Sequence, residues 1–247
     1  MTPRVLVVIP ARLGSRRFSN KAIYPLGGKP LLFYVHREVR RARGIGRLVI
    51  ATDSHRVRRA AEGFGAEVVM TSSRHRTGSD RVAEAALKLG ADIVVNFQGD
   101  NFGLKASSLE NLIGRMKEDR RLRFATLACR IDSDDDLFDA NKVKVVVGRD
   151  GRALWFSRFP LPYLQHATGG KRWRQYRFLR HVGVYAFRSK ALADYARWPQ
   201  TKLEKAESLE QLRILENGGD IRVFETRSAP VSVDSPHDLT KLKRLYI

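Results

Sequence analysis

The chain has 247 residues, of which 43% are hydrophobic, and this is enough for a full core in one large α/β domain or in one domain with an insertion. No stretch approaches the roughly 20 apolar residues of a membrane span, and the single cysteine, Cys129, excludes an intramolecular disulfide framework and fits a reducing cytoplasm. The formal net charge of +20 keeps nucleic-acid binding open, but the basic residues are spread over the whole chain, and attraction of a polyanionic substrate such as a nucleoside triphosphate is the more specific interpretation.

The first predicted element is a buried strand that leads into a basic loop. Residues 5–9 (VLVVI) form an unbroken apolar run, which is typical of a central strand in a parallel sheet. The basic residues of the loop that follows are Arg12, Arg16, Arg17 and Lys21. Because open α/β sheets bind ligands beyond the carboxyl ends of their strands, we interpret this loop as a candidate triphosphate site. The alternative is a solvated loop in an arginine-rich protein.

Strands and helices then alternate. The predicted elements are helices over 30–43 and 55–64 and strands over 47–51 and 67–70. This alternation indicates right-handed βαβ units and a parallel sheet. A further helix begins within residues 74–81 (RHRTGSDR), where Thr77 or Ser79 could cap the helix and its free N–H groups could face an anion.

A third buried strand, predicted over 92–97, delivers Gln98, Gly99 and Asp100 to the same edge of the sheet as the basic loop. A carboxylate at a strand end, close to a phosphate-binding loop, is well placed to hold Mg²⁺. One aspartate after a strand is by itself a weak pattern, so this interpretation depends on the other motifs.

The second half of the chain is predicted to add an inserted segment and more helices. The predicted elements are a helix over 107–118, a strand over 124–131, a capped turn over 132–136, a hairpin over 141–158, an irregular stretch over 159–179, a strand over 179–187, one amphipathic helix over 203–215 and a short helix from His237. We therefore expect a single domain over 1–247 with an inserted β-rich lid over roughly 142–190.

These motifs, taken in order, resemble the CTP-dependent sugar-acid activating enzymes, in particular the 3-deoxy-manno-octulosonate (Kdo) cytidylyltransferase or CMP-Kdo synthetase family. The matching pieces are Pro10-Ala11-Arg12, Arg17, Lys21 and Gly28-Lys29-Pro30, then residues 75–81, Gln98-Gly99-Asp100, the segments 141–147 and 156–158, Arg180-His181 with Gly183 and Tyr185, residues 209–213 and Val233-Asp234-Ser235-Pro236. They span essentially the whole chain.

The resemblance implies a Rossmann-like, mostly parallel α/β sheet and Mg²⁺-dependent transfer of CMP from CTP to a small anionic acceptor, in a cytoplasmic homodimer with no nucleic-acid or membrane partner. It implies catalytic roles for Arg12, Arg17, Lys21 and Asp100. It implies nucleotide contacts at Pro10, Ala11, Arg12, Lys21, Thr77, Gly78, Ser79 and Gln98. It implies acceptor contacts at Arg158, His181, Tyr185, Glu210 and Gln211, and metal ligation by Asp100 and Asp234.

Three departures from the family pattern affect the expected acceptor. Asn101-Phe102 replaces the usual Glu-Pro, Ser19-Asn20 and Ala22 replace the usual Pro-Gly and Pro around Lys21, and Arg76 adds charge within the motif at 75–81. Each change makes the site less acidic or gives it a different shape, which favours a compact, highly charged acid, for example a phosphonate such as phosphonoformate, while a Kdo-like sugar acid or Kdo itself stays open. The hypothesis of another class is a non-catalytic basic protein that binds nucleotides or nucleic acid; retention of Lys21 and of both aspartates argues against it.

Overall fold

The computed structural model describes all residues except 1, 15–17, 19, 168, 232 and 234–237. The strands among the described residues are β1 (Val5–Pro10), β2 (Pro25–Leu26), β3 (Lys29–Pro30), β4 (Arg47–Thr52), β5 (Glu67–Met70), β6 (Ile93–Phe97), β7 (Phe124–Arg130), β8 (Lys144–Val147), β9 (Ala153–Ser157), β10 (Leu179–Arg188) and β11 (Ile221–Glu225). The helices are η1 (Lys21–Ile23), α1 (Leu31–Arg40), α2 (His55–Glu62), α3 (Gly78–Leu89), α4 (Ala106–Glu118), α5 (Asp134–Phe138), α6 (Arg172–Gln175), α7 (Ser189–Arg197), α8 (Lys202–Glu207), α9 (Leu212–Glu216) and α10 (Leu239–Tyr246).

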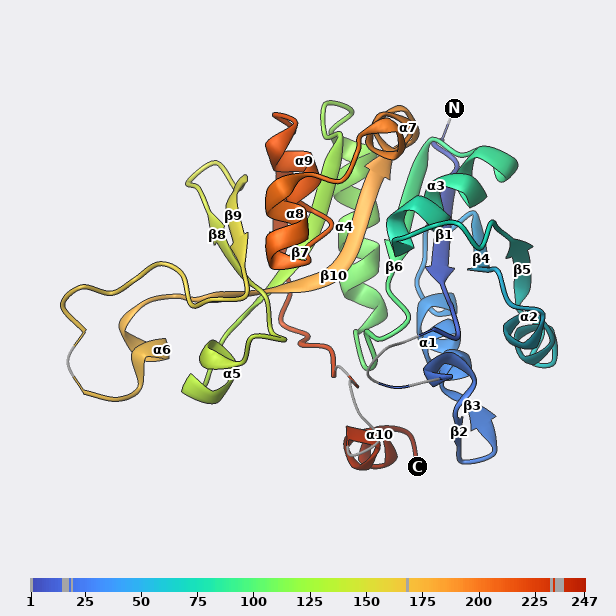
Figure 1. Cartoon of the computed structure of the whole chain (residues 1–247), viewed down its shortest axis with the longest axis horizontal. Helices are drawn as coiled ribbons and strands as arrows, with labels where there is room; N and C mark the ends of the chain where they lie inside the picture. Colours follow the sequence, from blue (N-terminus) through green and yellow to red (C-terminus); the bar gives the residue numbers. More distant parts are fainter. Residues whose placement is uncertain (1, 15–17, 19, 168, 232, 234–237) are drawn as a thin grey trace.

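The fold is the expected mostly parallel α/β sheet, with an antiparallel strand inside it. The strand order is β11-β7-β10-β6-β1-β4-β5 (Figure 1). The strands β6, β1, β4 and β5 are parallel to one another. Strand β10 runs antiparallel to both β6 and β7, whereas β11 pairs in parallel with β7.

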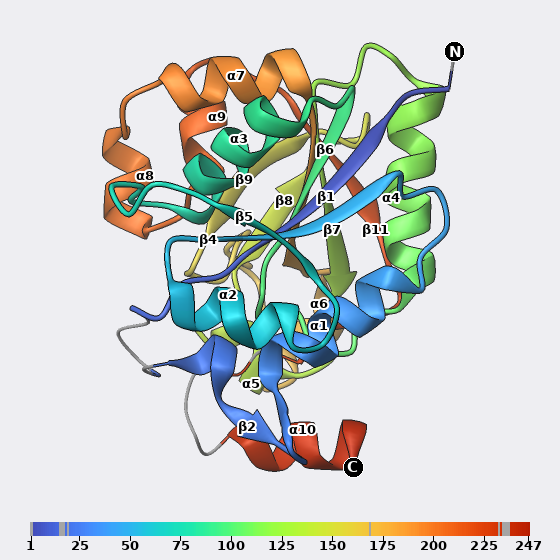
Figure 2. The same cartoon turned by 90° about the vertical axis from the view of Figure 1, so that its right-hand side faces the viewer.

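Strand β1 is buried on both faces, as the apolar run of residues 5–9 predicts. Val5, Val7 and Ile9 join the core under α1, α2, α4 and α10, whereas Leu6 and Val8 join the core under α3, α7 and α9. Figure 2 shows α3, α7 and α9 together on one side of the strands and α1 and α4 on the other. The carboxyl end of β1, where the basic loop begins, is therefore held by packed side chains on both faces of the sheet.

One part of the chain extends the sheet, because β8 pairs with β10 and with β9. The hairpin of β8 and β9, together with α5 and α6, lies at one end of the molecule (Figure 1). Of the segment 142–190 that we expect as an inserted lid, β10 belongs to the main sheet. Among the described residues, no helix is both long and apolar enough to cross a membrane.

The prediction of one helix over 203–215 is wrong. The segment forms α8 and α9, and the chain between them turns at Ser208, which has φ 52° and ψ 48° in the left-handed region. Helix α8 begins at the capping box of Thr201 and Glu204, and it ends where the N–H of Leu209 donates to the carbonyl of Glu204. The turn moves Glu210 out of a helical face and toward α3. Strand β11 and helix α7 were not predicted.

Candidate active site

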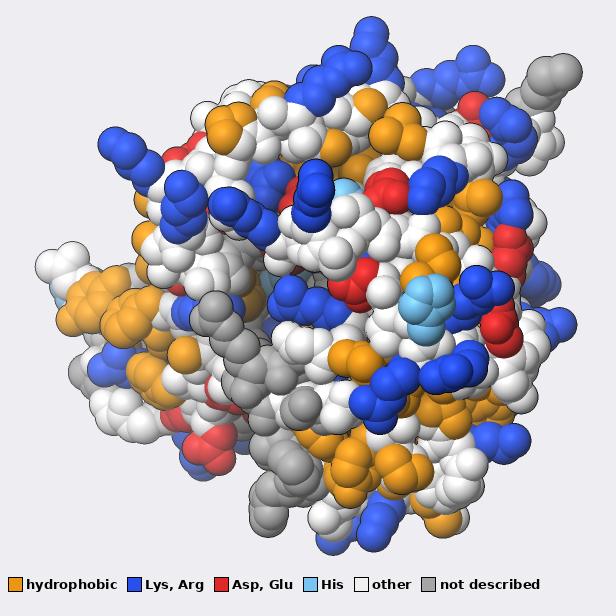
Figure 3. Space-filling model, turned by 45° about the vertical axis from the view of Figure 1, so that its right-hand side comes forward, with side chains coloured by type: hydrophobic (Ala, Val, Ile, Leu, Met, Phe, Trp, Pro, Cys, Tyr) orange, Lys and Arg blue, Asp and Glu red, His pale blue; other side chains and the backbone are white. Residues whose placement is uncertain are grey.

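A cavity of about 740 Å³ lies beyond the carboxyl ends of β1 and β6. Its lining residues come from the basic loop and η1, the start of α3, the end of β6, the inserted segment and the turn before α9. They are Pro10, Ala11, Arg12, Lys21, Ala22, Leu32, His75, Thr77, Gly78, Arg81, Gln98, Gly99, Asp100, Asn141, Arg158, Ser208 and Glu210. Lys and Arg side chains predominate over Asp and Glu on the face drawn in Figure 3.

The basic loop supplies cations to this cavity. Arg12 and Lys21 line it, and the Lys21 Nζ forms an ion pair with Asp100 at 3.5 Å. The Lys21 side chain is 15% exposed, whereas that of Asp100 is 47% exposed, so the carboxylate is accessible from the cavity and the ammonium is largely shielded. Arg17 lies outside the described residues.

The amino terminus of α3 also faces the cavity. Thr77 is the N-cap and forms a capping box with Asp80, in which the Thr77 hydroxyl accepts from the Asp80 N–H at 3.1 Å. Gly78 packs closely on the end of β6, because a Cβ there would lie 3.2 Å from the Gln98 Nε2. The capping box and this close packing place the first free N–H groups of α3 against the cavity. Of the two caps that the sequence allows, the structure uses Thr77.

Glu210 occupies those N–H groups. Its two carboxylate oxygens accept from the N–H of Gly78 at 3.3 Å and from the N–H of Ser79 at 3.1 Å. Burial raises the pKa of the Glu210 carboxyl, the hydrogen bonds from Ser79 oppose that rise, and the charge of Asp80 adds to it. A carboxylate held by a helix amino terminus is electrostatically favoured, so Glu210 is fixed in the wall of the cavity.

Arg158 reaches the cavity from the end of β9. Its guanidinium donates to the backbone carbonyls of Glu207 (2.7 Å), Ala140 (2.9 Å) and Ser208 (3.3 Å). Carbonyl groups orient the guanidinium but do not neutralise its charge, so it can still attract an anion.

Three predicted acceptor residues lie behind the cavity wall instead of among its lining residues. The Tyr185 hydroxyl donates to the Gln211 Oε1 at 2.9 Å, and both side chains are buried. His181 contacts the Thr126 hydroxyl at 2.9 Å, and burial lowers the pKa of His181 to about 3. The structure therefore brings together Glu210 and Arg158 at the cavity, while His181, Tyr185 and Gln211 form the layer beneath them.

Comparison with known proteins decides the family. A cytidylyltransferase family model matches residues 6–221. The chain belongs to the cytidylyltransferase family. This makes it a CTP-dependent nucleotidyltransferase, and it supports the predicted enzyme over the non-catalytic alternative.

Individual relatives of this cytidylyltransferase agree with the family model. The 3-deoxy-manno-octulosonate cytidylyltransferase of Geobacter sulfurreducens is 42% identical over 96% of this chain and 97% of its own length. The Escherichia coli enzyme of the same name is 38% identical over 98% of this chain and 96% of its own length. A solved structure of CMP:2-keto-3-deoxy-manno-octonic acid synthetase in complex with CTP is 38% identical, with a TM-score of 0.89 over 98% of both chains. These matches confirm the resemblance to the CMP-Kdo synthetase family that the motifs indicate.

The cavity of the cytidylyltransferase includes residues that we did not predict as site residues. His75 lines it and bonds the Glu84 Oε2 at 2.5 Å. Arg81 lines it from a buried position, where it forms an ion pair with Asp53 at 3.1 Å. Both belong to the motif at 75–81, which could have identified them, whereas the plain polar Ser208 gives no signal in the sequence.

Of the departures behind the phosphonate hypothesis, Ala22 lines the cavity of this cytidylyltransferase, whereas Asn101 and Arg76 do not. Asn101 is buried, and its Nδ2 donates to the carbonyl of Gly183 at 2.8 Å. Arg76 lines a separate groove beside α3. Neither side chain is therefore part of the cavity lining.

Proposed function

We propose that this cytidylyltransferase activates Kdo: CTP and Kdo react to give CMP-Kdo and pyrophosphate. The observation that carries the proposal is the single cavity in which cations from the basic loop, the amino terminus of α3, Arg158 and Glu210 come together. The relatives at 42% and 38% identity support Kdo as the acceptor. A phosphonate acceptor loses the support of Asn101 and Arg76, because neither side chain lines this cavity.

In the proposed reaction an oxygen of the acceptor attacks the α-phosphorus of CTP in line, and pyrophosphate leaves. Negative charge builds up on the non-bridging and leaving oxygens, so the enzyme acts mainly by positioning and by electrostatic stabilisation. Arg12, Arg17 and Lys21 balance the negative charge of the triphosphate. The further nucleotide contacts are proposed at Pro10, Ala11, Thr77, Gly78, Ser79 and Gln98. The reaction needs no covalent nucleophile.

Arg158 and Glu210 are proposed to hold the acceptor directly. A guanidinium suits the carboxylate of a sugar acid, and a carboxylate accepts hydrogen bonds from its hydroxyl groups. We propose that His181, Tyr185 and Gln211 act on the acceptor from the layer beneath the cavity wall. The neutral His181 and the Tyr185–Gln211 hydrogen bond support such a role by giving that layer one fixed arrangement.

The proposed metal ion is Mg²⁺, held by Asp100 and Asp234. An exposed carboxylate on the cavity fits this ion, which takes one or two carboxylates together with substrate phosphates and water. Asp234 lies outside the described residues, and among the residues that are described no group of three or more potential metal-binding side chains occurs. When bound, the metal ion would neutralise phosphate charge and would lower the pKa of the acceptor hydroxyl group.

We further propose that the enzyme is a cytoplasmic homodimer. Support for self-association comes from large apolar side chains at the surface of the inserted segment, namely Leu154, Phe159 and Tyr163, which are 60%, 69% and 74% exposed. Exposed apolar groups of this kind often mark interfaces.

Pyrophosphate release with CTP, ATP, GTP or UTP, each combined with Kdo or phosphonoformate, tests the proposal. We expect fast release only with CTP and Kdo. Equal rates with ATP and CTP would refute CTP as the specific donor. A higher kcat/KM for phosphonoformate than for Kdo would refute Kdo as the acceptor.

A further inference from the structure

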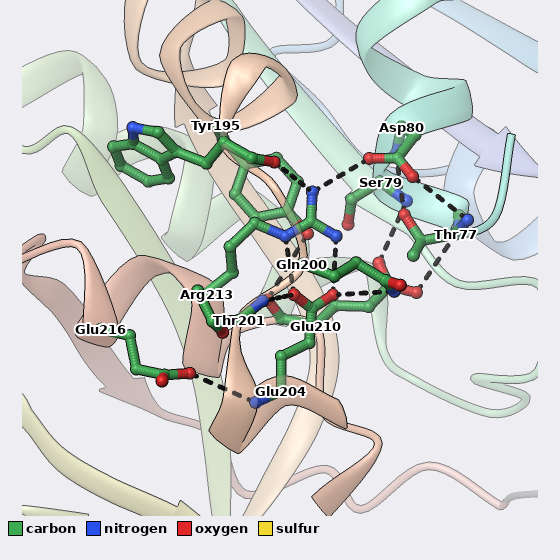
Figure 4. A network of polar contacts seen from close by, with 12 residues as sticks. Thr77, Ser79, Asp80, Tyr195, Gln200, Thr201, Glu204, Glu210, Arg213 and Glu216 are labelled. Carbon is green, nitrogen blue, oxygen red and sulfur yellow. Dashed lines mark hydrogen bonds and ion pairs between the residues drawn. The ribbon is translucent and has the colours of Figure 1, made fainter. Parts of the chain in front are cut away.

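Arg213, the second residue of α9, lies at the centre of a buried polar cluster (Figure 4). Its Nε and Nη2 donate to both carboxylate oxygens of Glu204, at 2.8 Å and 2.6 Å. Its Nη1 donates to the Asp80 Oδ1 at 3.2 Å, and its guanidinium lies 4.4 Å from the ring centre of Tyr195. With its side chain only 2% exposed, Arg213 connects α9 to α8, α3 and α7.

The contact with Asp80 connects Arg213 to the amino terminus of α3. Asp80 uses its other carboxylate oxygen to accept from the N–H of Thr77 at 3.3 Å, within the capping box. One carboxylate thus holds both the N-cap of α3 and the guanidinium of α9. Thr77 and Gly78 line the cavity, so this connection reaches the cavity wall through one residue.

A second connection runs from the same helix to the same wall. Glu210 precedes Arg213 in the turn that begins at Ser208, and its carboxylate accepts from the N–H groups of Gly78 and Ser79. The Tyr195 hydroxyl donates to the backbone carbonyl of Glu210 at 3.4 Å. Tyr195 therefore contacts both the turn and the guanidinium that holds the turn in place.

The cluster concentrates negative charge around one cation. Asp80, Glu204 and Glu210 are carboxylates within it, and Arg213 forms ion pairs with the first two. A guanidinium can contact two carboxylates and a ring at once because its five N–H donors lie in one plane. A lysine ammonium at this position would keep the charge but not this set of contacts.

We propose that Arg213 is a positioning residue that fixes Glu210 against the amino terminus of α3, and thereby aligns the acceptor side of the cavity with the nucleotide side. It acts through Asp80 and Glu204 and touches neither substrate. This inference rests on the proposed function, because the acceptor role of Glu210 is part of that function.

The test compares Arg213→Lys and Asp80→Asn with Glu216→Gln. Asp80→Asn removes the ion pair to α3 but keeps an oxygen that can accept from Thr77, so it covers the case in which Arg213→Lys does not fold. Glu216 is the matched control, because it accepts from the N–H groups of Leu203 and Glu204 in the same helix pair without a contact to α3. The readouts are the KM values for Kdo and for CTP, and hydrogen exchange of the Gly78 and Ser79 amides.

We expect both test variants to raise the KM for Kdo by about tenfold, the effect of losing one charge-assisted hydrogen bond. The KM for CTP rises by a smaller factor, because the proposed contacts at Gly78 and Ser79 loosen while Arg12 and Lys21 are untouched. Exchange at Gly78 and Ser79 becomes faster in both test variants and stays unchanged in Glu216→Gln. A smaller amount of folded enzyme would change neither KM value.

Unchanged KM for Kdo in both test variants, or an equal change in Glu216→Gln, would overturn the inference. Wild-type enzyme that does not use Kdo would refute the proposed function instead. In that case the exchange data decide alone: faster exchange in Asp80→Asn than in Glu216→Gln supports the inference, and equal exchange overturns it.

Discussion

Replacement of Lys21 by methionine should nearly abolish transfer while leaving the fold intact. The side chain keeps its length and apolar stem but loses the ammonium, which lies 3.5 Å from Asp100 and lines the cavity. Coulomb's law with an effective dielectric constant of about 20 gives about 5 kcal/mol for two unit charges at this distance. In Lys21→Met, a phosphate oxygen of CTP at a similar distance loses an attraction of about the same size. Water and the neighbouring arginines replace part of that attraction.

We therefore expect kcat/KM of Lys21→Met to fall by about 10²- to 10³-fold, the range found when one donor to a developing oxyanion is removed. Stability should change by less than about 1 kcal/mol, because ion pairs with an exposed partner contribute little. The assay is pyrophosphate release at saturating Mg²⁺, with urea unfolding as the measure of stability.

Arg4→Ala is the control for a diffuse electrostatic field. The Arg4 side chain is 74% exposed, lies before β1 and pairs only loosely with Asp92 at 3.8 Å. We expect its kcat/KM to stay close to that of the wild type. Similar losses in Arg4→Ala and Lys21→Met would refute the reasoning, since the cations would then act through net charge alone.

Three further predictions concern the metal site, a buried histidine and position 101. Asp100→Asn should cut turnover by orders of magnitude, because an amide lacks the charge that the metal requires. It should also weaken Mn²⁺ binding, measured by electron paramagnetic resonance in the presence of CTP. Near-normal turnover at limiting Mg²⁺ would exclude Asp100 as a ligand. Burial lowers the pKa of His181 from 6.5 to about 3, so between these pH values the unfolded state binds a proton that the folded state does not. The free energy of unfolding should therefore fall by about 1.4 kcal/mol for each pH unit below 6.5. The same dependence of stability on pH in His181→Asn would contradict this. Asn101→Glu should lower the free energy of unfolding by about 1–3 kcal/mol, because a buried carboxylate cannot donate to the Gly183 carbonyl, and unchanged stability in urea unfolding would show that this contact is dispensable.

Local patterns in the sequence predicted the parts of the fold that depend on neighbouring residues. The unbroken apolar run at 5–9 predicted a strand buried on both faces, and alternate residues of β1 do enter the two cores. A cap at Thr77 or Ser79 was predicted, and the structure uses Thr77, whose capping box with Asp80 closes within one helical turn. Asp100 was predicted at the sheet edge of the basic loop because it directly follows the buried strand β6.

Only the tertiary structure decided which of the predicted site residues reach the cavity. The segment 203–215 has a helical pattern, yet it breaks at Ser208, and Glu210 binds N–H groups of Gly78 and Ser79 that lie more than a hundred residues earlier. His181 lies under the cavity wall because β10 enters the sheet antiparallel between β6 and β7. Helix periodicity and strand alternation report which face of an element is buried, but they do not report which distant backbone group a carboxylate will meet, and that contact is what forms the cavity wall.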